Sequence, residues 1–313
     1  EIDSSTPNSF AYFIGLSLKI GKYFISQILP DSILVKDFYK TRTKLKDKIY
    51  SIRWYQNTAL AEDKRPFKDV EHDVCILEYN NIKATKNCMV SKIISDNVKS
   101  LNLQKKDFIL SEYDNSYNLS LNKGDIELIK KLRDLDKLSS LLQCHEGIHT
   151  GNIRNKLFIK KKINGTEKPV FVGGRSGDKI ENYISKRNGW FVDYRKEIID
   201  QDKKEYASLR DENIFKNPKI YVSRTGNPFK AFIDEKTYAS NNFFSIQFIN
   251  ENYNTLENLK PLLGLLNSKF SNYYIRRVIA PSLGNTFVET KIIHLLKIPL
   301  KKGLIYNTKL KSL

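Results

Sequence analysis

One apolar run near the amino terminus does most to restrict the fold of this chain. Residues 23–29 are almost continuously apolar, have the length of a strand and are ended by Pro30. Such a run is typical of a strand that is buried on both faces of its sheet. Two further strand-like runs follow at residues 49–55 and 74–79. Residues 1–90 are therefore predicted to form half of an α/β sheet, with no visible first half in this sequence.

Helical patterns lie between and after these strands. Four apolar residues recur at the spacing of one helix face, from the first strand up to the first residue of the second. They are Leu34, Phe38, Leu45 and Ile49. Residues 91–143 are predicted to be a helical connector. Its clearest element is a helix over residues 124–142, where leucine recurs every three or four residues and Lys and Arg fall between.

The chain becomes rich in strand signals from Cys144 onward. Candidate strands separated by Gly, Asn and Asp clusters lie at residues 157–161, 169–172, 190–194, 219–223 and 243–248. A helix with Pro261 in its first turn is predicted through residue 274. The predicted fold class is thus α/β followed by α+β, with residues 144–313 as the second domain.

The charge of the chain points to a partner class. Lys and Arg number 53 and Asp and Glu number 35, which gives a formal net charge of +18. A surface with this excess attracts a polyanion, so nucleic acid is the first partner to expect.

The cysteine content and the absence of long apolar windows restrict the compartment. The three cysteines form no CxxC pair, so neither a disulfide framework nor a zinc knuckle is expected. No window approaches the roughly 18 apolar residues of a membrane span, and the first residues lack the features of a signal peptide. These observations favour a reducing cytoplasm and no membrane partner.

Three loops combine glycine with side chains that contact phosphates and base edges, at residues 147–156, 173–179 and 224–230. Residues 151–190 alone carry ten Lys or Arg against three Asp or Glu. The bland interpretation of each loop is a solvated turn in a lysine-rich protein. We interpret the three together as a DNA-binding surface, with contacts predicted for Thr150, Asn152, Arg154, Asn155, Lys156, Arg175, Lys179, Arg224, Asn227 and Lys230.

Other chemistries have weaker support. No GxxxxGK[ST] loop and no GxGxxG turn occurs, so no nucleotide-cradling site is predicted. A metal ligand set is conceivable around residues 144–149, but His145 and His149 are more simply loop hydrogen-bond donors, and no metal is expected.

A divalent-metal nuclease is a further alternative. Asp31 with Glu62 and Lys64 resembles a pattern in which acids hold the ion and a lysine assists the attacking water. Asp31 also has a ready structural role as the cap of the helix that follows it.

Several sequence blocks together carry a family resemblance, at residues 16–24, 28–32, 39–45, 65–70, 147–151, 168–174, 265–268 and 291–299. These blocks resemble the TaqI-type DNA adenine methyltransferases and the fused restriction-modification enzymes that share their carboxyl-terminal specificity domain. The resemblance implies that residues 1–90 are the trailing part of a methyltransferase-like sheet. It also implies that residues 144–313 are a target-recognition domain for double-stranded DNA.

The resemblance further implies that catalysis and DNA recognition belong to different parts of a longer polypeptide. Phe67 matches the family's aromatic residue that stacks on an extruded adenine, although a core position is an equal alternative. The glycine-containing cofactor motif and the [DNS]PP[YFW] tetrapeptide are both absent from the 313 residues. S-adenosylmethionine and the catalytic residues are therefore expected in an amino-terminal methyltransferase portion of a longer polypeptide, and this chain alone is expected to be inactive. A free-standing specificity subunit, like those of type I restriction systems, is the main rival.

Overall fold

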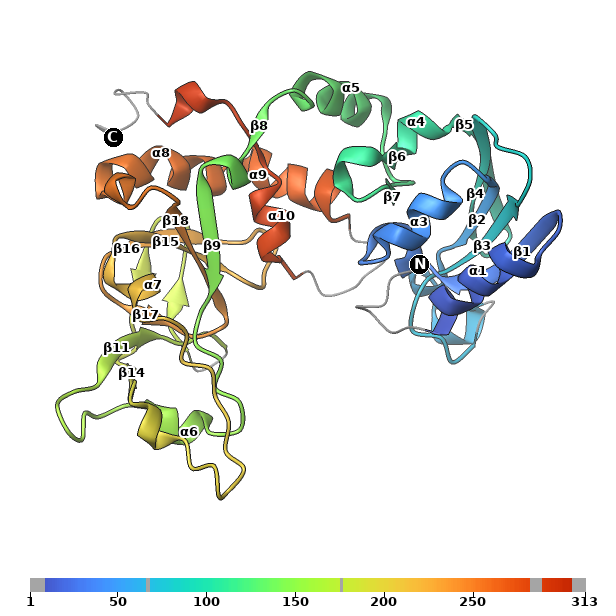
Figure 1. Ribbon diagram of the computed structural model, residues 1–313. Helices are drawn as coiled ribbons and strands as arrows, with labels where there is room; N and C mark the ends of the chain where they lie inside the picture. The colour runs from blue at the N-terminus through green and yellow to red at the C-terminus, as the bar shows by residue number, and fades with distance from the viewer. Residues whose placement is uncertain (1–8, 66–67, 175–176, 282–288, 306–313) are drawn as a thin grey trace. The chain divides into compact units, whose positions relative to one another are not determined.

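The computed structural model describes residues 9–65, 68–174, 177–281 and 289–305. These residues form two compact units. The first unit holds the described residues up to 133 together with 276–281, and the second holds 134–275 and 289–305. The boundary after residue 133 falls inside the segment that the sequence predicts as a connector. Figure 1 labels the elements of both units.

A five-stranded mixed sheet organises the first unit. Its strands are β1 (Phe24–Pro30), β2 (Ile49–Tyr55), β3 (Val74–Asn80), β4 (Asn87–Ile94) and β5 (Asn97–Gln104). The order is β1-β3-β2-β4-β5, so β1 and β5 are the edges. Strand β3 is antiparallel to both β1 and β2, whereas β2 and β4 are parallel. Two strands of the same direction therefore enclose one that runs against them.

Short helices accompany this sheet. They are α1 (Ser9–Ile20), α2 (Ser32–Val35), α3 (Tyr39–Leu45), α4 (Lys105–Phe108) and α5 (Lys123–Leu132), with 3-10 turns η1 (Asn57–Ala59), η2 (Glu62–Lys64) and η3 (Ser111–Tyr113) and the small strands β6 (Ile109–Leu110) and β7 (Ser116–Tyr117). Apolar residues of the helices and of the sheet share one core, for example Ile14, Leu34, Leu45 and Leu77. Burial of this face holds the short helices in place, since helices of one or two turns are marginal alone.

Arg42 lies fully buried inside this core region. Its guanidinium donates hydrogen bonds to the carbonyl oxygens of Ile33, Lys36, Asp114 and Asn115 at 2.6–3.3 Å. Asp114 and Asn115 both have positive φ angles, 58° and 49°. One side chain thus joins α3 to α2 and its C-cap and to the turn between η3 and β7, which is distant in sequence.

The outer edge of the sheet carries exposed apolar side chains. Phe24 and Ile28 on β1 are 72% and 62% exposed. Helix α1 adds an exposed stripe of Tyr12, Phe13, Leu16 and Ile20. Sheets with parallel strands are normally covered on both faces. In the part of the chain that is described, the first unit leaves an apolar edge and helix stripe uncovered.

A return segment completes the first unit. Arg277 Nε donates to the buried carboxylate of Asp125 at 2.9 Å, and Asn118 Nδ2 donates to the carbonyl oxygen of Arg277 at 2.7 Å. Asp125 also forms a capping box with Asn122 at the start of α5. Residues 276–281, which we call the return segment, are therefore anchored in the first unit.

Asp31 directly follows β1 and is buried beside Asp73. Burial, and then the charge of Asp73, raise the pKa of Asp31 from 3.8 to about 7. The unfolded chain loses this proton near pH 4, while the folded chain keeps it until about pH 7. The free energy of unfolding should therefore fall as the pH rises from about 4 to about 7.

Replacement of Asp31 by asparagine removes this pH-dependent loss of stability. We expect Asp31→Asn to raise the free energy of unfolding by roughly 1 to 3 kcal/mol at pH 8, and by much less at pH 4. Urea titrations at both pH values measure the difference. Asp63→Asn, at an exposed position, is the control and should change stability by less than about 0.5 kcal/mol. An equal effect of Asp31→Asn at the two pH values would contradict the assignment.

Two four-stranded sheets organise the second unit. One has the order β16-β15-β18-β9, and the other has the order β10-β14-β11-β17. The strands of the first are β9 (Leu142–Glu146), β15 (Lys219–Ser223), β16 (Ala231–Asp234) and β18 (Phe243–Phe248). Those of the second are β10 (Phe158–Ile159), β11 (Lys168–Phe171), β14 (Phe191–Val192) and β17 (Tyr238–Ala239). Phe171, Tyr221, Phe232 and Phe243 pack their rings together in the core of this unit.

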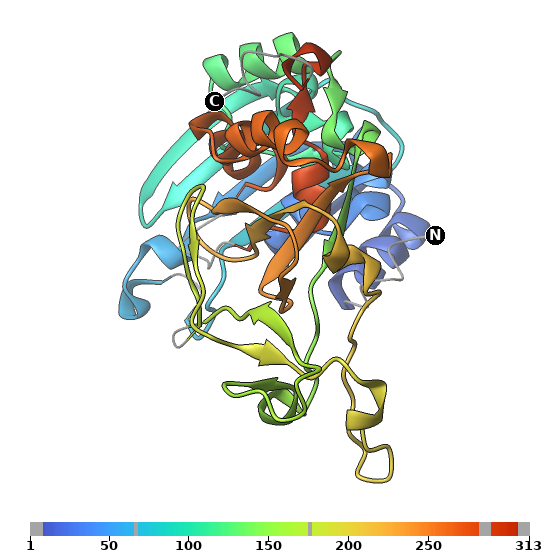
Figure 2. The same cartoon turned by 90° about the vertical axis from the view of Figure 1, so that its left-hand side faces the viewer.

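Smaller elements surround these sheets. Two more strand pairs are β12 (Lys179–Ile180) with β13 (Ser185–Lys186), and β8 (Asp136–Lys137) with β19 (Pro299–Leu300). The helices are α6 (Arg154–Leu157), α7 (Asn213–Lys216), α8 (Leu256–Leu266), α9 (Lys269–Tyr274) and α10 (Ile292–Leu296). The remaining 3-10 turns are η4 (Leu138–Ser140), η5 (Lys196–Ile198), η6 (Glu251–Tyr253) and η8 (Lys302–Leu304). The π-helix η7 (Ile275–Ile279) begins at the last residue of the second unit and continues in the first. Figure 2 shows α6 at the far end of this unit from α8, as Figure 1 also does.

Several predicted elements have different limits in the structure. The helix predicted over residues 124–142 ends at Leu132, because Leu138 and Leu142 are buried in the second unit, where Leu142 begins β9. The predicted helix before β2 is divided into α2 and α3. Pro261 lies inside α8 and not in its first turn, because Thr255 caps the helix by accepting from the backbone of Asn258. Tertiary packing overrides the local pattern in each case.

Candidate nucleic-acid interface

The three glycine-containing loops begin at one place in the second unit. Residues 239–243, which we call the β17–β18 junction, accept a backbone hydrogen bond from each loop. Gly147 N donates to Phe243 O at 3.1 Å and Arg224 N donates to Asn242 O at 2.9 Å. Gly173 N lies 3.4 Å from Ser240 Oγ. The loops that the sequence singles out are therefore gathered around one short segment at their starting points.

Two glycines make this gathering possible. A Cβ atom added to Gly147 would lie 2.2 Å from the carbonyl oxygen of Ser240, and one added to Gly173 would lie 2.5 Å from the Cβ of Asn242. Neither position can hold a larger residue without a backbone shift. Both glycines therefore allow the close approach of one protein segment to another.

An ion-pair network stands beside the junction. Arg210 Nη2 lies 2.5 Å from Glu146 Oε2, and its Nε donates to Gly147 O. Arg224 Nη1 lies 3.8 Å from Glu146 Oε1, and Arg224 Nε is paired with Glu289. The Arg224 guanidinium also lies 5.9 Å from the centroid of the Phe244 ring. Two arginines thus fix the position of one carboxylate.

Predicted contact residues of the third loop, and Lys179 of the second loop, have partners in the second unit. Lys230 Nζ donates to Ile180 O at 3.0 Å, which ties the loop to the β12–β13 hairpin. Asn227 Oδ1 accepts from Asn272 Nδ2 at 3.4 Å. Lys179 is in β12, opposite Lys186.

The rest of the first loop leads away from the junction toward α6. Asn152 is bonded on both sides to the segment at residues 204–206, since its Oδ1 accepts from Tyr206 N and its Nδ2 donates to Lys204 O. Lys156 Nζ pairs with Glu205 at 2.8 Å. Arg154 lies over the ring of Phe158, and Asn155 is exposed beside it. Thr150 accepts from Ile153 N through its carbonyl oxygen.

The predicted contact residues therefore fall into two groups in the second unit. Arg224, Asn227 and Lys230 lie near the junction, whereas Arg154, Asn155 and Lys156 lie in α6 and Asn152 shortly before it. Thr150 precedes the second group in the same loop, and Lys179 lies in β12. Arg175, like Phe67 in the first unit, lies outside the described residues. Whether the residues of either group touch DNA stays a prediction.

A basic and aromatic surface, not singled out residue by residue from the sequence, covers the β10–β14 strands. Lys160 Nζ lies 4.0 Å from the centroid of the Trp190 ring, and Lys162 Nζ lies 5.2 Å from that of Phe191. Arg187 lies 5.9 Å from the same Phe191 ring. The excess of Lys and Arg in residues 151–190 is the sequence signal for this surface.

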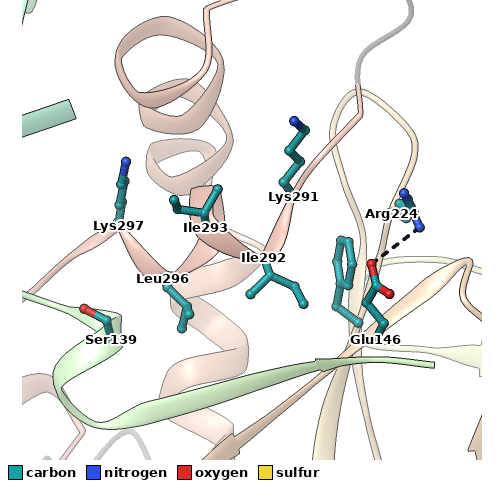
Figure 3. A pocket seen from close by; sticks show the side chains of 9 residues that line it. Ser139, Glu146, Arg224, Lys291, Ile292, Ile293, Leu296 and Lys297 are labelled. Carbon is teal, nitrogen blue, oxygen red and sulfur yellow. Dashed lines mark ion pairs between the residues drawn. The ribbon is translucent and has the colours of Figure 1, made fainter. Parts of the chain in front are cut away.

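A recess of about 660 Å³ opens beside the ion-pair network. Figure 3 shows Glu146 and Arg224 at one side of it and α10 along another. The lining is apolar at Phe244, Ile292, Ile293 and Leu296, with charges at its rim. The lining residues are Ser139, Glu146, Arg224, Phe244, Lys291, Ile292, Ile293, Leu296 and Lys297.

The nuclease and metal alternatives gain no geometric support. Asp31 is buried beside Asp73, whereas Glu62 and Lys64 are exposed residues of η2. In the described residues, no three or more His, Cys, Asp or Glu side chains are grouped so that they could hold a metal ion. Burial lowers the pKa of His145 and raises that of the Cys144 thiol.

Among the helices of the described segments, none has both the length and the apolar character needed to cross a membrane.

Comparison with known proteins gives one family match. Residues 175–300 match the family model of the TaqI-like C-terminal specificity domain, which confirms the predicted resemblance over this segment. No curated protein sequence matches the chain.

Three solved structures illustrate the wider similarity. The type IIG restriction endonuclease BpuSI is 14% identical with a TM-score of 0.39, over 96% of this chain and 44% of its own. The DNA complex of the type IIL restriction-modification enzyme MmeI is 10% identical with a TM-score of 0.46, over 96% and 40%. The DNA-bound type ISP enzyme LlaBIII is 9% identical with a TM-score of 0.47, over 96% and 26%. This chain spans less than half the length of each of these proteins.

Proposed function

We propose that this chain recognises a specific sequence in double-stranded DNA, as the carboxyl-terminal part of a restriction-modification DNA adenine methyltransferase. The observation that carries the proposal is the match of residues 175–300 to a specificity domain. The net charge of +18 supports the same partner. Cationic side chains bind the phosphates of any sequence, and groups that reach base edges distinguish one sequence from another.

The basic and aromatic surface over β10–β14 is suited to the first of these tasks. Lys160, Lys161 and Lys162 are exposed, and Lys160 Nζ and Lys162 Nζ lie over the rings of Trp190 and Phe191. Lys160 Nζ also donates to the carbonyl oxygen of Asn188. Each phosphate that a lysine neutralises releases about one counterion. Binding through this surface should therefore be sensitive to salt and indifferent to sequence.

Alanine at Lys160, Lys161 and Lys162 should lower the salt dependence of DNA binding. We expect the slope of log K against log [salt] to become less steep by about 2 to 3, because each lost phosphate contact contributes about 0.9. Fluorescence anisotropy with a labelled duplex between 50 and 300 mM NaCl (roughly the range where such slopes are linear) measures it. The matched control replaces three other exposed lysines of the second unit, Lys236, Lys260 and Lys301. Equal slopes for the two triple variants would refute this surface, and wild-type binding that is indifferent to salt would refute the proposed function.

The first unit suggests where the catalytic portion attaches. Strand β1 is an edge of the mixed sheet, and Phe24 and Ile28 are exposed on it next to the apolar stripe of α1. An edge strand with exposed apolar side chains needs a partner to avoid aggregation. We propose that an amino-terminal methyltransferase portion extends the sheet beside β1 and covers this surface.

S-adenosylmethionine belongs to that amino-terminal portion in this proposal. The residues of the present chain do not fit it, because neither the glycine-containing cofactor motif nor the [DNS]PP[YFW] tetrapeptide occurs in the sequence. No step of methyl transfer is therefore assigned to this chain. Phe67, in the segment between β2 and β3, is proposed from the family resemblance to stack on the extruded adenine.

A further inference from the structure

A carboxylate occupies an unexpected position in a chain of this charge. Glu146 ends β9 and lines the recess together with Arg224, which follows β15. Their side chains are 37% and 33% exposed, so both can be reached from the solvent. Glu146 is held by Arg210 and Arg224, and if this face meets DNA, as proposed, a carboxylate on it is repelled by the phosphates. Such a carboxylate can still accept a hydrogen bond from a base amine, which no phosphate offers.

The positions of both charged groups are fixed by ion pairs with other side chains of the second unit. Glu146 Oε2 is fixed by Arg210 at 2.5 Å, which leaves Oε1 on the side of Arg224. Arg224 is anchored through Nε by Glu289, so its terminal nitrogens are directed elsewhere, with Nη1 3.8 Å from Glu146 Oε1. Figure 3 shows the two side chains facing each other at the side of the recess. Such support lowers the conformational entropy lost on binding.

The spacing and order of these groups select one base pair. In the major groove a guanine presents two adjacent acceptors, N7 and O6, and its paired cytosine presents the N4 amine next to them. A guanidinium beside a carboxylate offers two donors followed by one acceptor, which is the complementary order. An A·T pair places its amine between two acceptors and does not match this order.

We propose that Arg224 and Glu146 read one G·C base pair together, with Arg224 donating to guanine N7 and O6 and Glu146 accepting from cytosine N4. Lys291 and Lys297 on the rim of the recess contact the flanking phosphates. The inference rests on the proposed DNA-binding function. Glu146 is not among the DNA-contact residues predicted from the sequence.

Selection from a pool of randomised duplexes tests the pair. The full chain, Glu146→Gln and Arg224→Lys are each used to select bound duplexes, and the recovered sequences are compared. The wild type should select a G·C pair at one position. Each variant should lose about 5- to 100-fold discrimination at that position only, while the other positions of the recovered sequence stay unchanged. Glu235→Gln, an exposed change of equal charge in the same unit, should leave the whole sequence unchanged.

The outcomes separate this inference from the proposed function. A specific sequence that is the same for the wild type and both variants would refute the base-pair assignment and leave the proposed function standing. A uniform loss of affinity for every duplex would also refute it, since it would indicate phosphate contact or a folding defect, and circular dichroism melting would tell these apart. A wild type that selects no sequence would overturn both.

Discussion

If an amino-terminal portion covers β1 as proposed, aspartate in place of Phe24 is expected to leave this chain folded by itself and to destabilise the proposed longer polypeptide by about 3 kcal/mol or more. Phe24 is 72% exposed on β1, so a charge there costs the isolated chain less than about 0.5 kcal/mol. If an amino-terminal portion covers this edge, the same carboxylate becomes buried without a partner, which is among the most costly changes in a folded protein.

Thermal or urea unfolding of the chain and of the longer polypeptide, each with and without the substitution, measures the two effects. Val98→Asp on β5 is the matched control, because Val98 is an exposed apolar residue on the opposite edge of the same sheet. It should be nearly neutral in both backgrounds. Equal, small effects of Phe24→Asp in the chain and in the longer polypeptide would contradict the proposed attachment at β1.

Methionine in place of Arg42 is expected to lower the free energy of unfolding of the first unit by about 3 to 5 kcal/mol. The guanidinium serves the carbonyl oxygens of four residues in a buried site, and methionine fills a similar volume without any donor. The carbonyls would then be left unsatisfied, and Asp114 and Asn115 would keep their left-handed conformations without compensation.

Urea titration followed by circular dichroism measures the loss. Arg42→Lys should fall between the wild type and Arg42→Met, because an ammonium can serve some of these carbonyls but not all of them at once. Arg53→Met is the control, since Arg53 is half-exposed and forms a surface ion pair with Glu78 that contributes at most about 1 kcal/mol. A similar small loss for Arg42→Met and Arg53→Met would show that the buried network is not a main support of the unit.

The limits of several strands are predicted better than their burial. The apolar run at residues 23–29 forms β1, but β1 is an edge strand in which only Leu29 is buried, so the predicted burial on both faces is wrong. Strands β2, β15 and β18 have the predicted limits, and every residue of β18 is buried. The β4–β5 hairpin was missed because β5 is exposed along nearly its whole length and carries no such run. Residues 135–142 have a helical leucine pattern, but pairing of β8 with β19 and of β9 with β18 determines their structure.

The sequence predicts which loops form the candidate site but not which of their side chains form ion pairs and hydrogen bonds. Glycine and basic residues identified the three segments that meet at the β17–β18 junction. The sequence gives no local sign that Arg224 pairs with Glu289, 65 residues away, or with Glu146 on another strand. Asn152 and Lys156 have side chains that could contact DNA, but in the structure these side chains bind residues 204–206, for which the sequence shows no local signal.

The return segment restricts how the second unit could be exchanged between related chains. Arg277 holds the buried carboxylate of Asp125, although the residues on either side of residues 134–275 are far apart in sequence. A chimera that takes everything from residue 134 onward from a donor would separate this pair and leave a buried charge without its guanidinium. Crossover points at 134 and 275 keep this pair within the recipient, but residues 289–305 belong to the second unit, where β19 pairs with β8 and Glu289 pairs with Arg224. Module replacement should therefore take these residues from the donor as well, through a third junction between residues 281 and 289.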